Sequence, residues 1–210
     1  MGASSHIDPG AAGAPGSYWT TLTTWPAYVP TRYYFSNSGL STTVPLGTTS
    51  LVATYAYNPA NPVPTAGGSN LFESCGPLDQ SALEKRPDVV QWSSEPLTAP
   101  LAVTGPLIVE LWVSSNVTDT DFTVKLTDVY PSGYSALLQD GIVRMRWRNR
   151  ASSTVAQPMV PGTVYAVNVS LWSTSFIWAV GHRIRVSVSS SNSPRFRFVS
   201  QFMQRRTMIE

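Results

Sequence analysis

Two histidines are the residues that acid–base or nucleophilic chemistry would need, and they lie in different settings. His6 lies among Gly, Ala, Ser and Pro, where nothing would hold a catalytic base in place. His182 begins a run of alternating apolar and basic residues, which is typical of a strand. A nucleophilic serine often lies on a Gly-x-Ser-x-Gly turn, and the sequence contains no such turn. We therefore predict no catalytic residue and interpret His182 as a hydrogen-bonded histidine at a strand start, with a base or an anion contact as the alternative.

Two carboxylates, Asp119 and Asp121, are spaced two residues apart directly after a Ser-Ser-Asn-Val-Thr turn. On an extended chain both could point to one side, as a glycosidase pair or a metal site would require. Turns also favour Asp because its side chain hydrogen-bonds to nearby backbone. We interpret the pair as structural, with a calcium-type oxygen site as the alternative. We accordingly predict no bound metal and no cofactor.

The most concentrated charge in the sequence is a series of arginines at every second position: Arg144, Arg146, Arg148 and Arg150. Their alternation with apolar residues predicts a strand that carries the arginines on one face. Such a ladder could bind phosphates or carboxylates, or it could pair with acidic side chains of a neighbouring strand or domain. Because the formal net charge is only +2, we favour the structural or interdomain role over nucleic-acid binding.

Aromatic residues offer a third kind of site. Several tryptophans could form a platform on which sugars stack, as in carbohydrate-binding sandwiches: Trp92, Trp112, Trp147, Trp172 and Trp178. Core packing is the alternative and explains most of these rings. A carbohydrate-binding or other ligand-binding sandwich therefore remains the second interpretation of the chain.

The elements that would position these residues are strands. Within 106–148 the apolar residues recur at every second position in three runs, which predicts three consecutive strands with one buried and one wet face. The second run places Phe122, Val124 and Leu126 inward and predicts a solvent-exposed face with Thr123 and Lys125. The third run extends to Arg148.

The whole chain shows about nine such runs, turn signals at about 8–12-residue spacing and no amphipathic helix of useful length. We predict an all-β fold, a jelly-roll β-sandwich of the galactose-binding-like type with few or no helices. Residues 1–17 are expected to be a flexible lead-in, 18–194 the sandwich domain and 195–210 an irregular C-terminal tail. A long loop is expected over 65–86, with one helical turn within 81–85.

Composition limits the remaining possibilities. Charged residues make up 12% of the chain, about half the usual share, so we expect part of the surface to be covered by a partner. The single cysteine, Cys75, excludes a disulfide framework within the chain and leaves the compartment undetermined. No run approaches the ~18 apolar residues that a membrane-spanning helix needs.

Several motifs, in order, resemble one known domain. They are Arg86-Pro-Asp-Val-Val-Gln-Trp-Ser-Ser-Glu-Pro-Leu97, Val103-Thr-Gly-Pro-Leu107, Asp119-Thr-Asp-Phe-Thr-Val-Lys-Leu-Thr-Asp-Val-Tyr-Pro-Ser-Gly133, Asp140-Gly-Ile-Val-Arg-Met-Arg-Trp-Arg148 and Gly181-His-Arg-Ile-Arg-Val-Ser-Val-Ser-Ser-Ser191. Over about 18–194 the sequence is similar to the C-terminal jelly-roll domain of the CocE/NonD serine hydrolases. That family includes cocaine esterase, α-amino acid ester hydrolases and X-Pro dipeptidyl-peptidases.

The resemblance implies a module without catalytic residues, because the family's Ser-Asp-His triad belongs to an α/β-hydrolase domain. No matched position is a triad residue, and His182 falls in the jelly roll's Gly-His-Arg motif. The expected function is to support the catalytic domain, on the same or a separate chain, and to form contacts between copies. From Arg195 onward the sequence departs from the family's pattern, which predicts an unfinished sheet edge open to another chain.

Overall fold

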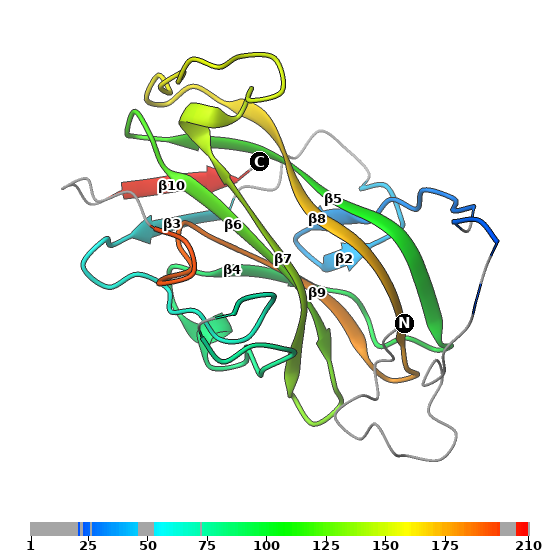
Figure 1. Ribbon diagram of the computed structural model, residues 1–210. Coiled ribbons are helices and arrows are strands. Elements are labelled where there is room, and N and C mark those ends of the chain that lie inside the picture. The colour runs from blue at the N-terminus through cyan, green and yellow to red at the C-terminus, as the bar shows by residue number, and fades with distance from the viewer. Residues whose placement is uncertain are drawn as a thin grey trace.

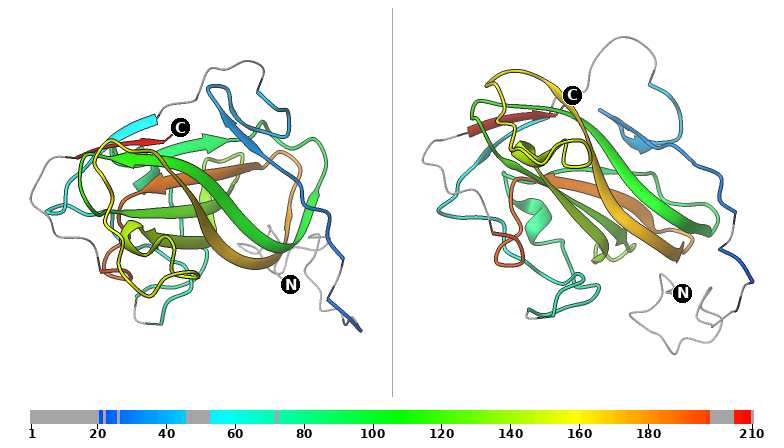
Figure 2. Two further views of the ribbon diagram at one scale, coloured as in Figure 1. Left: turned by 90° about the horizontal axis from the view of Figure 1, so that it is seen from above. Right: turned by 45° about the horizontal axis from the view of Figure 1, so that its top comes forward.

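The computed structural model describes residues 21, 23–25, 27–45, 53–71, 73–197 and 205–209, the last five for their backbone only. The predicted lead-in over 1–17 and His6 lie outside these residues. The described chain forms two four-stranded antiparallel sheets packed face to face, with a small hairpin beside them (Figures 1 and 2). The predicted all-β sandwich is therefore confirmed.

The described chain contains ten strands and two single 3₁₀ turns. The strands are β1 (Tyr34–Ser36), β2 (Gly39–Ser41), β3 (Ala53–Tyr57), β4 (Val90–Ser93), β5 (Leu101–Ser115), β6 (Asp121–Val129), β7 (Ser135–Arg144), β8 (Tyr165–Trp178), β9 (Arg183–Ser189) and β10 (Arg205–Ile209). The turns are η1 (Leu83–Lys85), as predicted within 81–85, and η2 (Met145–Trp147). No helix among the described residues has the length and apolar character needed to cross a membrane.

The strand order makes this sandwich a jelly roll. One sheet has the order β3-β10-β5-β8 and the other β4-β9-β6-β7. Each strand pairs with the strand at the mirrored place in the chain: β6 with β7, β5 with β8, β4 with β9 and β3 with β10. These nested pairs describe one long hairpin wound around the sandwich, which confirms the predicted topology.

The C-terminal segment corrects one expectation. The sequence predicts an unfinished edge because it departs from the family's pattern from Arg195 onward, yet β10 lies between β3 and β5 and pairs with both. The chain therefore completes this sheet with its own backbone. The edges of the sheet are β3 and the long β8.

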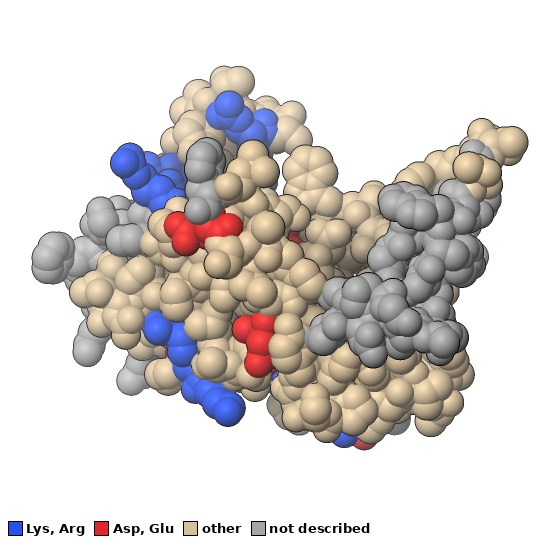
Figure 3. Space-filling model, turned by 60° about the horizontal axis from the view of Figure 1, so that its bottom comes forward, with Lys and Arg blue, Asp and Glu red and all other residues tan. Residues whose placement is uncertain are grey.

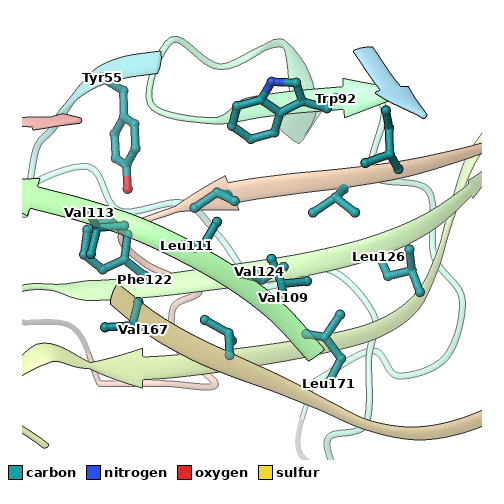
Figure 4. Close-up of a cluster of buried hydrophobic side chains, with 14 of the residues drawn as sticks. Tyr55, Trp92, Val109, Leu111, Val113, Phe122, Val124, Leu126, Val167 and Leu171 are labelled. Carbon is teal, nitrogen blue, oxygen red and sulfur yellow. The ribbon is translucent and has the colours of Figure 1, made fainter. Parts of the chain in front are cut away.

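Strand β5 follows the predicted alternation. Val109, Leu111 and Val113 are buried, whereas Ile108 and Trp112, which alternate with them, are exposed. Inward side chains of both sheets form one core, which includes Leu111, Phe122, Val124, Val167 and Leu171 (Figure 4). Most of the free energy that holds the two sheets together comes from this apolar burial.

Strand β6 departs from the prediction. All nine of its residues are buried, including Thr123 and Lys125 on the face predicted to be wet. The cause lies in the segment before β4. Gln80 and Glu84 of this segment hydrogen-bond to Lys125 and Thr127, so the segment covers the outer face of the sheet.

The predicted third strand ends earlier than expected. β7 stops at Arg144, and the chain continues as η2, so Arg146 and Arg148 do not lie on a strand. The backbone N–H of Met145 donates to Thr120 O, which draws this turn onto the start of β6. The predicted ladder of four arginines on one strand face is therefore wrong.

Candidate functional site

The arginines and aspartates singled out in the sequence are brought together as pairs. Arg144 binds Asp121 with two parallel hydrogen bonds, Nε to Oδ1 at 2.8 Å and Nη2 to Oδ2 at 2.9 Å. Asp119 accepts the backbone N–H of Arg146 at 2.9 Å and also its Nε. Burial raises the pKa of Asp121, although the hydrogen bond from Arg144 opposes this. Both carboxylates are thus engaged by arginines that lie more than twenty positions later in the chain.

Arg148 is also engaged within the chain. Its Nη1 donates to the carbonyl oxygens of Met145 and Gln157, and its guanidinium lies over the Tyr165 ring, 4.4 Å from the centroid. These contacts hold the segment 145–164, which connects β7 to β8, against the start of β8. Across the described ranges, no group of three or more His, Cys, Asp or Glu side chains could hold a metal ion.

His182 lies at the start of β9 with its ring against buried groups. Its Nδ1 is 2.8 Å from Oδ1 and 3.0 Å from Oδ2 of Asp128, whose side chain is fully buried, and its ring lies tilted against that of Tyr130 with the centroids 4.1 Å apart. Burial raises the pKa of Asp128 from 3.8 to about 6, although the hydrogen bond with His182 lowers it. No local pattern in the sequence shows that His182 lies beside Asp128, because the two residues are 54 positions apart.

The raised pKa of Asp128 has a measurable consequence for stability. Between pH 4 and 6 the folded state keeps a proton that the unfolded state has released, so the wild type should lose stability as the pH rises through this window. Asp128→Asn removes this titration. We expect the unfolding free energy of the wild type to fall relative to that of D128N between about pH 4 and 6 in urea titrations. A wild-type unfolding free energy that rises relative to that of D128N between pH 4 and 6 would contradict the assignment.

A buried polar network fixes the covering segment on β6 and its neighbours. Glu84, with a side chain 3% exposed, accepts hydrogen bonds from Ser135 Oγ at 2.8 Å and from Arg185 Nη1 at 2.6 Å. Lys125 Nζ donates to Gln80 Oε1 at 2.8 Å, and burial lowers its pKa to about 8. The network therefore ties residues 80–84 to three strands of one sheet.

The same network borders an open pocket of about 530 Å³. Its polar lining includes Asp79, Glu84, Lys85, Gln91, Tyr134 and Arg185. Its carboxylates already have partners: Asp79 accepts from Ser81 and Ser135, and Glu84 is held as described above. The carboxylates that line the pocket therefore stabilise the fold, and they do not form an arrangement of nucleophile and base.

The tryptophans divide into two groups. Trp92 and Trp178 are buried, so they contribute to the core and not to a platform. Trp147 is half-buried beneath Arg150 at 4.9 Å. Trp112 and Trp172 are exposed on the outer side of β5 and β8. Charged side chains are sparse over much of the surface seen in Figure 3, in keeping with the low share of charged residues.

The fold and the absence of a nucleophile–base arrangement among the described residues agree with comparisons to known proteins. The family model of the X-Pro dipeptidyl-peptidase C-terminal non-catalytic domain matches residues 4–206. The chain belongs to this family. The relation to the C-terminal domain of CocE/NonD-type hydrolases that the sequence motifs predict is thereby confirmed.

Several relatives of this X-Pro dipeptidyl-peptidase C-terminal domain are hydrolases. Over 194 residues the chain is 42% identical to cocaine esterase of Rhodococcus sp. (strain MB1 Bresler), a match that covers 85% of this chain and 33% of the esterase. An aminopeptidase from a marine sediment Thaumarchaeota archaeon is 28% identical with a TM-score of 0.80, covering 93% of this chain and 37% of that one. An α-amino acid ester hydrolase is 26% identical with a TM-score of 0.81, covering 92% and 37%. The chain spans about a third of the length of these relatives.

Proposed function

We propose that the chain supports the α/β-hydrolase catalytic domain of a CocE/NonD-type serine hydrolase, on the same or a separate chain, and contributes contacts between subunits. The parent enzyme would hydrolyse esters or peptides, as the names of the relatives indicate for those proteins. The observation that carries this proposal is the match of nearly the whole chain to a non-catalytic domain family.

The contacts of the charged residues support a mechanical role. Asp119, Asp121 and Asp128 are each paired with a basic side chain of the same chain. Glu84 fixes residues 80–84 on one sheet. A scaffold of this kind can hold loops in one position next to a neighbouring catalytic cleft, which is what precise positioning of a substrate requires.

An exchange experiment tests the proposal. We would replace the matching C-terminal third of the Rhodococcus cocaine esterase with this chain. If the chain supports a catalytic domain, the exchanged protein should be soluble and should hydrolyse p-nitrophenyl acetate at a rate within about tenfold of the parent esterase, a loss of about 1.4 kcal/mol of transition-state stabilisation. A soluble exchanged protein without activity would contradict the proposal.

A further inference from the structure

Two open pockets meet on the outer face of the sheet β4-β9-β6-β7. The first, of about 530 Å³, lies between residues 79–85 and the turn 132–134, and the second, of about 420 Å³, lies between the turn 36–39 and β4. Both volumes fall within the range of about 300–1,000 Å³ that is typical of small-molecule sites. Gln91 lines both pockets, and no other described residue does so. We call the two pockets together the Gln91 site.

The alternation of β4 and β9 directs polar side chains into the site. Trp92 is buried in the core, so its neighbours Gln91 and Ser93 point to the outer face of the sheet. The same alternation on β9 places Arg183 and Arg185 on that face, one in each pocket. A strand cannot turn these side chains inward without a shift of register, so the fold fixes the floor of the site.

The charges of the lining balance. Three lining residues are acidic and three are basic: Asp79, Glu84, Glu95, Lys85, Arg183 and Arg185. A ligand with a net charge of either sign would therefore lie against charges of its own sign, which opposes binding. The balance favours a ligand that is neutral and rich in polar groups.

Several polar groups of the lining keep hydrogen-bonding capacity for such a ligand. Arg185 is fixed by hydrogen bonds from Nε to Ser93 Oγ at 2.7 Å and from Nη1 to Glu84 Oε2 at 2.6 Å, whereas its Nη2 has no partner among the described residues. The Tyr134 hydroxyl donates to a backbone carbonyl at 3.1 Å and can still accept. The amide of Gln91 is exposed and can both donate and accept. Donors and acceptors side by side suit a hydroxyl group, which is both.

The lining favours a sugar over a peptide. An extended peptide gains its specificity from pockets for its side chains, and the residues that line the site include no aliphatic one. The large apolar side chains of the lining are the rings of Tyr134 and Trp92. The Tyr134 ring is held edge-on by that of Tyr130, with the centroids 5.7 Å apart. An aromatic ring in a polar pocket offers an apolar surface to the C–H face of a sugar ring.

We propose that the Gln91 site binds a neutral oligosaccharide, with one sugar unit in each of the two pockets. Gln91 would hydrogen-bond to hydroxyl groups of both units, because it lines both pockets. Arg185 Nη2 and the Tyr134 ring would contact the unit in the first pocket. This inference goes beyond the proposed function and holds whether or not a catalytic domain is present.

Isothermal titration of the full 210-residue chain with maltotetraose, cellotetraose, mannotetraose and galactotetraose tests the inference. We expect at least one of these sugars to bind with a dissociation constant of about 1 mM or lower. Gln91→Ala should weaken that binding about tenfold, because hydrogen bonds to both sugar units are lost. The matched control is Asn168→Ala, which removes an exposed amide from β8 in the other sheet and should leave the affinity unchanged. Both variants should keep the melting temperature of the wild type, because both side chains are exposed.

Four results would overturn the inference. No binding of any of the four sugars at about 10 mM would do so, as would binding that Gln91→Ala leaves unchanged. Binding that Trp172→Ala abolishes and Gln91→Ala does not would assign the sugar to the exposed tryptophans. Tighter binding of an acidic tetrasaccharide of galacturonic acid, with a steep dependence on salt, would assign the site to an anion.

Discussion

Replacing Glu84 by Ala is expected to lower the free energy of unfolding by about 3–5 kcal/mol. The carboxylate is buried and accepts hydrogen bonds from Ser135 and Arg185, and its removal leaves the Arg185 guanidinium without its counter-ion. Desolvating an unpaired charge is costly, whereas the pair itself contributes little beyond its own desolvation cost. The large loss of stability therefore reflects the desolvation cost of an arginine without its counter-ion, rather than the strength of one contact.

Urea denaturation of the isolated chain measures this change. Lys85→Ala is the matched control, because Lys85 is adjacent in η1 but exposed, and we expect it to change the unfolding free energy by no more than about 0.5 kcal/mol. Glu84→Ala combined with Arg185→Met should recover part of the loss, because it also removes the unpaired charge. Equal stabilities of Glu84→Ala and Lys85→Ala would show that residues 80–84 are not held as described.

Local periodicity predicted the elements that are buried on one face only. The alternation in β5, with Leu111 inside and Trp112 outside, is visible in the sequence and correct in the structure. In β6 the same pattern predicted that Lys125 is exposed, whereas it is buried. A period of two shows that two faces differ, but it does not show whether a distant segment will later cover the polar one.

The arginine series shows a second limit. Arg144 and Arg146 alternate with apolar residues, yet the strand ends between them because Asp119 accepts the backbone N–H of Arg146. This contact joins residues 27 positions apart, so no local pattern contains it. For the same reason the sequence could name His182 and Asp128 separately but could not predict that they touch.

Two other features follow from the tertiary arrangement alone. β10 has no alternating pattern, and its place between β3 and β5 results from the nested topology. Gly141 of β7 faces the β8 backbone so closely that an added Cβ would lie 2.2 Å from Ser170 O. The family motifs include Gly141 and predict the domain correctly, but they do not reveal which surface carries its function.

The largest expected effect is the difference in hydrolysis rate between this chain and an active serine hydrolase. An active enzyme of that kind accelerates hydrolysis by at least about 10⁶-fold, and it needs a nucleophile beside an oriented base. Among the described residues His182 is the one histidine, and although Asp128 holds its Nδ1 as a triad carboxylate would, its side chain is mostly buried. No serine hydroxyl in the described part of the chain hydrogen-bonds to that ring.

The most direct measurement is hydrolysis of p-nitrophenyl acetate and of an X-Pro anilide by the purified isolated chain. The scaffold role predicts rates equal to those of a heat-unfolded sample of the same chain at the same concentration. Turnover by the folded chain that disappears when a single one of its serines is replaced by Ala would contradict it.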